Sequence, residues 1–164
     1  MNSTLIASAG EFFVAHRLSC LGFIAAPVRA GSPAADLLAC RSDGDRTVAI
    51  QVKTTTWADR TKGRGEKKAV ARVEFPLGHA AIERAPKALI YCFVDLRINA
   101  GDSGAGMADS HAESPVVYVI PARALLKKYA GQDIRKHPWL RLHQPMEWMR
   151  QFRDNWSPIE RALS

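Results

Sequence analysis

The sequence is poor in cysteine and has no long hydrophobic run, and both absences exclude classes of protein. Its three cysteines, Cys20, Cys40 and Cys92, are widely spaced among apolar residues. An odd number with this spacing favours buried thiols of a cytoplasmic protein over a disulfide scaffold or a zinc site. No run approaches the roughly 18 apolar residues of a transmembrane helix. The first residues form no basic leader, so we expect neither a membrane span nor a signal peptide.

Motifs of several enzyme classes are also missing. The sequence has no Gly-rich phosphate loop, no G-x-S-x-G turn and no recognisable cysteine–histidine pair, which would mark nucleotide-binding enzymes, serine hydrolases and thiol enzymes. The polar contexts of four histidines, and their lack of metal-ligand spacing, predict surface positions. These are His79, His111, His137 and His143. We therefore expect no small-molecule cofactor.

Acidic residues are outnumbered by basic ones. The chain has 23 Lys and Arg residues against 16 Asp and Glu, a formal net charge of +7 with a pI near 9.7. This excess favours a polyanionic partner, either nucleic acid or a membrane surface. The length of 164 residues and the absence of repeats predict a single domain over residues 1–164.

Apolar periodicity predicts helices that alternate with strands. The expected helices cover residues 8–21, 78–84, 122–129 and 146–156. The expected strands cover residues 23–28, 34–40, 47–53, 73–76, 88–96 and 116–120. The run at 88–96 is almost wholly apolar, as in a central strand covered on both faces. This order predicts an α/β sandwich, with a central mixed β-sheet flanked by helices.

The strands at 34–40 and 47–53 are joined by a strong hairpin signal. Asp43-Gly44 lies between two apolar runs, and Asp-Gly is a preferred hairpin turn. A turn centred there places Asp36 directly across from Gln51, with Cβ atoms about 4.5–5.5 Å apart on one face. Lys53 has the same parity as Gln51 and lies on the diagonal. The register therefore predicts that a carboxylate, an amide and an ammonium group meet.

Charged groups rarely occupy an apolar strand pair without a partner or a function. The non-functional alternatives are an Asp36 satisfied by backbone N–H groups and a Lys53 that extends to solvent. The functional interpretation is a hard-cation site, because carboxylate and amide oxygens suit Mg²⁺ or Mn²⁺. Such an ion activates water at a phosphate ester, and a nearby lysine stabilises the developing charge.

Glu11 has two compatible interpretations. Ser8-Ala9-Gly10-Glu11 fits a capping box, in which the glutamate bonds back to the start of a helix. Glu11 also lies on the helix stripe of Val14, Leu18 and Leu21, which is expected to face the sheet. Its carboxylate is then directed toward Asp36 and Gln51.

Basic residues follow the hairpin directly. Residues 54–72 predict a mobile loop, and its cations either contact phosphate groups or form a solvated charged run. We favour phosphate contact for these residues: Arg60, Lys62, Arg64, Lys67, Lys68 and Arg72. Residues 99–114 predict a flexible connection. The segment 135–164 is rich in Trp and Arg, and its tryptophans either pack in the core or stack on nucleic acid.

A helical glutamate, then Asp36, then Gln51-Val52-Lys53 across a hairpin resembles the PD-(D/E)xK nuclease superfamily. The glutamine at the third position is similar to Mrr-type restriction endonucleases, and the helical glutamate to Holliday-junction resolvase-like members. The resemblance covers about Gly10 to Thr55, with support from the later strands. It implies a restriction-endonuclease-like fold, Mg²⁺- or Mn²⁺-dependent DNA hydrolysis and frequent homodimer formation.

The resemblance also implies roles for individual residues. Asp36 holds the metal, Gln51 replaces the usual acidic ligand and Val52 lends its backbone carbonyl. Lys53 positions water or stabilises charge, and Glu11 supports the metal or a water. Ala35 stands where the family has proline, and the neutral Gln51 removes one negative charge, which weakens Mg²⁺ binding.

Three functions remain open from the sequence. The first is a metal-dependent DNA endonuclease of the bacterial cytoplasm, acting in recombination, repair or defence against foreign DNA. The second is a DNA-binding module that keeps the nuclease fold with little or no turnover. The third is a protein-interaction subunit that uses the aromatic C-terminal segment.

Overall fold

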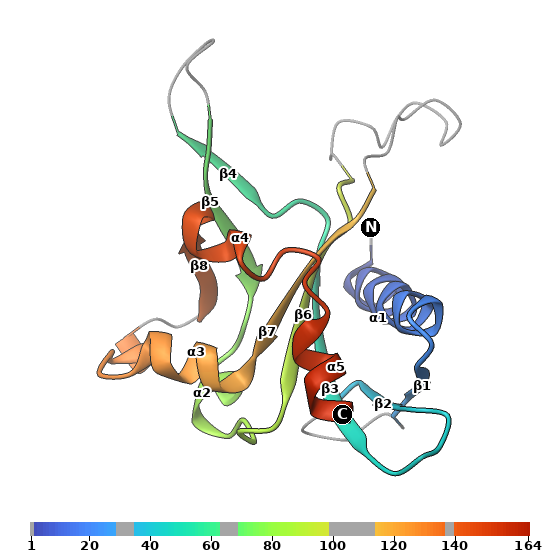
Figure 1. Ribbon diagram of the computed structural model, residues 1–164. Coiled ribbons are helices and arrows are strands. Elements are labelled where there is room, and N and C mark those ends of the chain that lie inside the picture. Colours follow the sequence, from blue (N-terminus) through green and yellow to red (C-terminus); the bar gives the residue numbers. More distant parts are fainter. Residues whose placement is uncertain (1, 29–34, 63–68, 99–113, 137–139) are drawn as a thin grey trace.

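A five-stranded sheet forms the centre of the molecule, and a three-stranded sheet packs against it (Figure 1). The computed structural model describes residues 2–28, 35–62, 69–98, 114–136 and 140–164. No helix among these residues is both long and apolar enough to cross a bilayer.

The central sheet has the strand order β1-β2-β3-β6-β7. Its strands are β1 (Ile24–Pro27), β2 (Leu37–Cys40), β3 (Thr47–Thr55), β6 (Ile90–Asp95) and β7 (Val116–Pro121). β3 and β6 pair in parallel, and the other neighbours pair antiparallel. Every residue of β6 is buried, as its continuous apolar run predicts. The predicted mixed sheet flanked by helices is therefore confirmed.

One face of the central sheet is covered by α1 (Ser3–Cys20) and α5 (Ser157–Leu163). Val14 and Leu18 of α1 pack in one cluster with Ile50 and Val52 of β3. The prediction that this helix begins at Ser8 is wrong. Its N-cap is Asn2, whose side chain accepts a hydrogen bond from the Thr4 amide at 2.9 Å, because the apolar pattern continues toward the N-terminus.

The capping-box interpretation of Glu11 is also wrong, because it required the helix to begin at Ser8. Ser8 lies inside the helix, so it cannot serve as the cap. Val14 and Leu18 of the predicted stripe are buried, but Gly10 rather than Glu11 is its buried member in the preceding turn. Leu21 follows the helix and is 39% exposed.

The other face of the central sheet carries the second sheet and three helices. The helices are α2 (Ala80–Glu83), α3 (Ala122–Tyr129) and α4 (Met146–Arg150), and a 3₁₀ turn covers Ile134–Lys136. The second sheet has the order β4-β5-β8, formed by β4 (Asp59–Lys62), β5 (Ala69–Pro76) and β8 (Arg141–Pro145). Phe75 of β5 contacts Phe93 of β6, with ring centroids 5.4 Å apart.

The prediction of a mobile loop over residues 54–72 is wrong for its described part. β3 continues to Thr55, and Asp59–Lys62 pairs antiparallel with β5. The cause is the one-sided burial of the second sheet, whose outer face is charged while Val73 and Phe75 point into the core. Residues 63–68 lie outside the described part of the chain, as do residues 99–113 of the predicted flexible connection.

The predicted helix over 146–156 is wrong in its second half. α4 ends at Arg150, and Asp154 adopts a left-handed φ of 49°. Its amide donates to the Val117 carbonyl at 2.6 Å, so this turn packs against β7. Trp156 is then buried at the start of α5, a helix that the sequence patterns did not indicate.

A buried ion-pair cluster joins the two sheets. The guanidinium of Arg97 contacts Asp59 of β4 at 2.7 Å and Asp95 of β6 at 3.1 Å. Arg97 has a left-handed φ of 58°, and its amide donates to Asp95 Oδ1 at 3.1 Å. Trp57 lies 5.1 Å from the Arg97 guanidinium. Burial raises the pKa of Asp95, against the opposing effect of Arg97.

Candidate active site

The hairpin that carries the candidate residues has the predicted register. Leu37 pairs with Ile50 and Cys40 with Thr47, as a turn centred on Asp43-Gly44 predicts for these residues. The Asp36 amide donates to the Ile50 carbonyl at 2.9 Å. This bond is one position out of the register of the strand pair, so the regular pairing ends at Leu37. Gly44 supplies the turn with a φ of 73°, a value that glycine adopts without steric cost.

The Asp36 side chain is fixed against the edge of β3. Its Oδ2 accepts a hydrogen bond from the Val52 amide at 2.7 Å. In a strand, the N–H and C=O of one residue point to the same neighbour, so the Val52 carbonyl also faces the Asp36 side of β3. One carboxylate oxygen and one carbonyl oxygen thus meet at this edge.

Gln51 and Lys53 lie on the face that turns away from α1. Val48, Ile50 and Val52 pack toward α1 and α5, so the alternation of the strand directs Gln51 and Lys53 to the other face. Both line a hollow with Tyr91, the β6 partner of Gln51. Asp36 lies at the edge between the two faces, because Ala35 packs in the cluster on this face and Leu37 in the cluster on the α1 face.

Tyr91, on this face, is within electrostatic reach of Asp36. Burial raises the pKa of Tyr91 to about 12, and the Asp36 carboxylate adds to that rise. The Tyr91 hydroxyl donates to the Ala81 carbonyl at 3.0 Å, which ties α2 to the floor of the hollow. Asp36, Gln51 and Tyr91 therefore belong to one neighbourhood.

Glu11 approaches Asp36 from the helix on the opposite face. α1 lies closest to β3 at Gly10, where a Cβ atom would stand 2.0 Å from Thr54 Oγ1. Glu11 follows directly and is half-buried. Its pKa is raised, first by burial and second by the charge of Asp36. The two carboxylates are thus within electrostatic reach, with Asp36 at the strand edge between the two faces.

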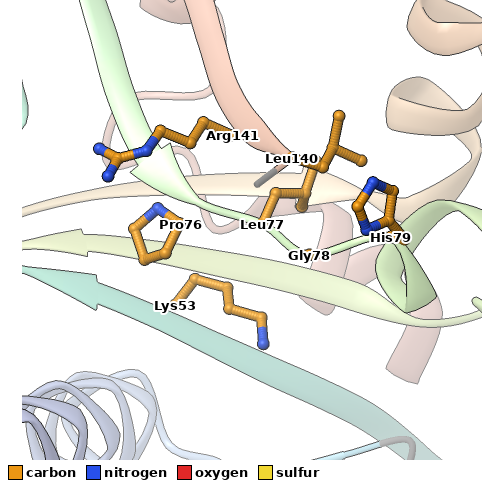
Figure 2. Close-up of a pocket in the computed structure, with 7 residues that line it drawn as sticks. All are labelled: Lys53, Pro76, Leu77, Gly78, His79, Leu140 and Arg141. Atoms are coloured by element: carbon orange, nitrogen blue, oxygen red, sulfur yellow. The ribbon is translucent and has the colours of Figure 1, made fainter. Parts of the chain in front are cut away.

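Lys53 also borders a second hollow, on the side of the smaller sheet. Figure 2 shows it with Pro76 and Arg141, while Leu77, Gly78 and His79 form the adjoining wall. His79, predicted to be a surface residue, is half-buried and lines both hollows. Lys53 lines both hollows, and within the described residues no ion pair joins it to Asp36.

A metal ion at this site would require donor atoms from several residues. In the described part of the chain, no three His, Cys, Asp or Glu side chains are grouped to hold a metal. The candidate donors are instead Asp36 and the Val52 carbonyl at the strand edge, with Glu11 on one side of the sheet and the Gln51 amide on the other. The prediction that Glu11 is directed toward Gln51 as well as Asp36 is therefore wrong for Gln51. All four donors supply oxygen, which fits Mg²⁺ or Mn²⁺ better than Zn²⁺. Two carboxylates are within the number that Mg²⁺ uses when a substrate phosphate completes its shell.

The predicted nucleic-acid residues lie on strands where they are described. Arg60 is in β4 and Arg72 is directly opposite in β5, and Lys62 ends β4. Arg60 forms an ion pair with Glu74 at 3.4 Å. Arg64, Lys67 and Lys68 lie outside the described residues. Arg141, one of the basic residues of the C-terminal segment 135–164, forms an ion pair with Glu74 from β8.

The cysteines only partly match their prediction. All three are free thiols, but Cys92 alone is buried, and Cys20 is exposed. Cys20 Sγ lies 3.7 Å from His16 Nε2 on the surface of α1. Burial raises the pKa of Cys92 far above its usual range, so this thiol is inert.

Comparison with known proteins supports the fold. No protein-family model matches the chain, and no curated protein matches it at a significant level. Among solved structures, the chain is similar to the bacterial homing endonuclease I-Ssp6803I, with a TM-score of 0.55 and 10% sequence identity. The similarity covers 99% of this chain and 94% of that one. At this identity the likeness shows a shared fold alone.

Proposed function

We propose that the chain is a metal-dependent DNA endonuclease that hydrolyses phosphodiester bonds. The observation that carries the proposal is the hydrogen bond from the Val52 amide to the Asp36 carboxylate, at the end of the β2–β3 pairing. This hydrogen bond holds the Asp36 carboxylate beside Val52 of β3, and Lys53 is the next residue of that strand. The nuclease fold, the net charge of +7 and the basic second sheet add support.

The residues divide into two roles. Asp36 and the Val52 carbonyl would hold Mg²⁺ or Mn²⁺, with Gln51 and Glu11 as further oxygen donors or holders of bound water. The ion would neutralise phosphate charge and lower the pKa of a bound water. Lys53 donates hydrogen bonds to the phosphate oxygen on which negative charge develops. Tyr91 keeps its proton at neutral pH because its pKa is about 12, and its hydroxyl holds α2 in place.

Cleavage of linear, supercoiled and branched DNA in Mg²⁺ or Mn²⁺ tests the proposal. Asp36→Asn keeps an acceptor for the Val52 amide and removes the charge, and we expect it to slow cleavage on the order of 100-fold or more. Lys53→Ala should have a similar effect. Asp45→Asn makes the same chemical change in the hairpin turn and should leave the rate unchanged. A wild-type protein that cuts none of these DNA forms would contradict the proposal.

The neutral Gln51 favours a second candidate, a nuclease-fold DNA-binding module with little turnover. Gln51→Glu distinguishes the two, because it restores an anionic donor to a site with few carboxylates. An enzyme should cleave at a lower Mg²⁺ concentration after this change. A binding module should bind DNA with a strong salt dependence, before and after Asp36→Asn, and cut it in neither state.

Cellular location, homodimer formation and the protein-interaction alternative complete the proposal. We place the protein in the bacterial cytoplasm, where its DNA substrate lies and where free thiols stay reduced. Homodimer formation stays a prediction from the resemblance. The third interpretation, a protein-interaction subunit, loses support because Trp156 is buried and Trp148 packs on Phe152 at 4.9 Å.

A further inference from the structure

The outer face of the second sheet is a continuous basic surface. In β5, Val73 and Phe75 are buried, and Arg72, Glu74 and Pro76 alternate with them. In β8, Leu142 and Gln144 are buried, whereas the alternate positions are exposed. We call this surface the basic face and define it by its charged and ionisable residues: Arg60, Arg72, Glu74, Arg141 and His143.

Two arginines of the basic face are directly opposed. Arg60 and Arg72 are Cα partners in the antiparallel β4–β5 pair. Like charges in such positions destabilise a sheet. Arg60 is partly compensated by Glu74 at 3.4 Å. Arg72 is exposed, and among the described residues no carboxylate forms an ion pair with it. The repulsion between Arg60 and Arg72 therefore lowers the stability of the sheet, and an anion bound beside them would reduce this repulsion.

Glu74 lies between two arginines from different strands. Arg60 of β4 and Arg141 of β8 both form ion pairs with its carboxylate. Although partial burial opposes it, the hydrogen bond from Arg141 and the charges of both arginines lower the pKa of Glu74. The carboxylate thus stays ionised and holds both guanidinium groups on the outer face. It also competes with any phosphate group that approaches them.

The basic face continues into the candidate active site. Pro76 and Arg141 of this face line the same hollow as Lys53 (Figure 2). A third hollow, lined by Lys136, Arg141 and His143, begins on the other side of Arg141. Arg141 therefore stands between the Lys53 hollow and the rest of the face. Figure 1 shows β4 and β5 leading away from the central sheet, which extends the charged surface.

We propose that the basic face binds the phosphate backbone of duplex DNA, with Arg72 and Arg141 as its main contacts and Glu74 as an internal competitor that limits affinity. This inference rests on the proposed function, since it takes DNA as the substrate. Duplex DNA fits because antiparallel strands can lie along a groove, and because the shared hollow leads from Arg141 to Lys53. Arg60 has the positioning role of holding Glu74.

Salt-dependent binding of a short DNA duplex tests this inference. Each phosphate contact contributes about 0.9 to the slope of log affinity against log salt concentration. Arg72→Gln with Arg141→Gln should therefore reduce the slope by about 2. Glu74→Gln should raise affinity several-fold. Arg46→Gln is the matched control: it removes one charge in the β2–β3 turn, roughly 20 Å along β3 from Lys53, and should leave the slope unchanged.

The results separate this inference from the proposed function. An unchanged slope in the double variant, or weaker binding in Glu74→Gln, would overturn the basic face whether or not the protein cuts DNA. A reduced slope in a protein without cleavage would keep the basic face and reject the nuclease. Equal affinity for single-stranded RNA of the same length would overturn the assignment to duplex DNA. Thermal unfolding of each variant shows that it is folded, and Arg72→Lys should retain most of the slope.

Discussion

Gly10 of α1 lies so close to Thr54 of β3 that a Cβ atom at position 10 would stand 2.0 Å from Thr54 Oγ1. This approach sets the distance between the helix and the strand at the level of Glu11. A glycine inside a helix usually costs about 1 kcal/mol relative to alanine, and here that cost permits the contact.

Gly10→Ala should therefore destabilise the protein, although alanine is the better helix former. We expect a net loss of about 1–2 kcal/mol, because overpacking outweighs the gain in helix propensity. Urea denaturation measures the loss, and cleavage should fall as well since Glu11 moves with the helix. Thr54→Ala on the same background should restore part of the stability. A Gly10→Ala protein that is more stable than wild type would show that the helix has room to shift.

The raised pKa of Glu11 predicts a pH-dependent effect of Glu11→Gln. Burial and the nearby Asp36 raise this pKa above its ordinary value of 4.5, so the folded state favours the neutral form. The stabilisation from this group is present at low pH and is lost as the pH rises through the folded-state pKa. Glu11→Gln should therefore unfold at a higher temperature than wild type at pH 7, and the difference should vanish near pH 4.

Added Mg²⁺ should stabilise the wild type, in which the ionised Glu11 is otherwise destabilising at pH 7. An ion held by Glu11 and Asp36 favours their ionised forms, so it should raise the unfolding temperature of the wild type more than that of Glu11→Gln. Glu160→Gln, on the exposed surface of α5, is the control and should change neither quantity. Equal Mg²⁺ effects in wild type and Glu11→Gln would show that Glu11 does not contribute to ion binding.

Removal of the Arg97 side chain should be among the costliest changes in the protein. Arg97→Ala leaves Asp59 and Asp95 buried without their cation, and such a loss costs about 3–5 kcal/mol. Arg135→Ala breaks an ion pair with Glu83 in which the arginine side chain is 79% exposed, and should cost at most about 1 kcal/mol. Chemical denaturation compares the two. Similar losses would mean that the Arg97 cluster adds little to the attachment of the second sheet.

Local signals in the sequence predicted the hairpin and the central sheet. Asp43-Gly44 predicted the register in which Leu37 pairs with Ile50 and Cys40 with Thr47, because a tight turn leaves few ways to pair the flanking residues. The turn does not specify the irregular backbone bond of Asp36, which ends this register. The apolar run at 88–96 predicted a strand covered on both faces, because only a strand buried on both sides can be apolar at every position.

Other features depend on contacts between distant residues, which no local pattern contains. The pairing of β5 with β8 brings Arg141 to Glu74 across 67 residues. The short polar segment of β8 shows only a brief alternation, so this strand was not predicted. The strand at 73–76 was found, but β4 and the start of β5 were predicted to be a loop. Glu11 matched a capping box because four residues suffice for that pattern, whereas the true start of the helix depends on Asn2.

The position of β3 in the middle of the central sheet has a consequence for how activity is lost on heating. Edge strands and termini open in small local events, but a middle strand becomes exposed only when most of the domain unfolds. Since Gln51 and Lys53 belong to this strand, inactivation and global melting should occur as a single event, and amide protons of β3 should be among the slowest to exchange with solvent.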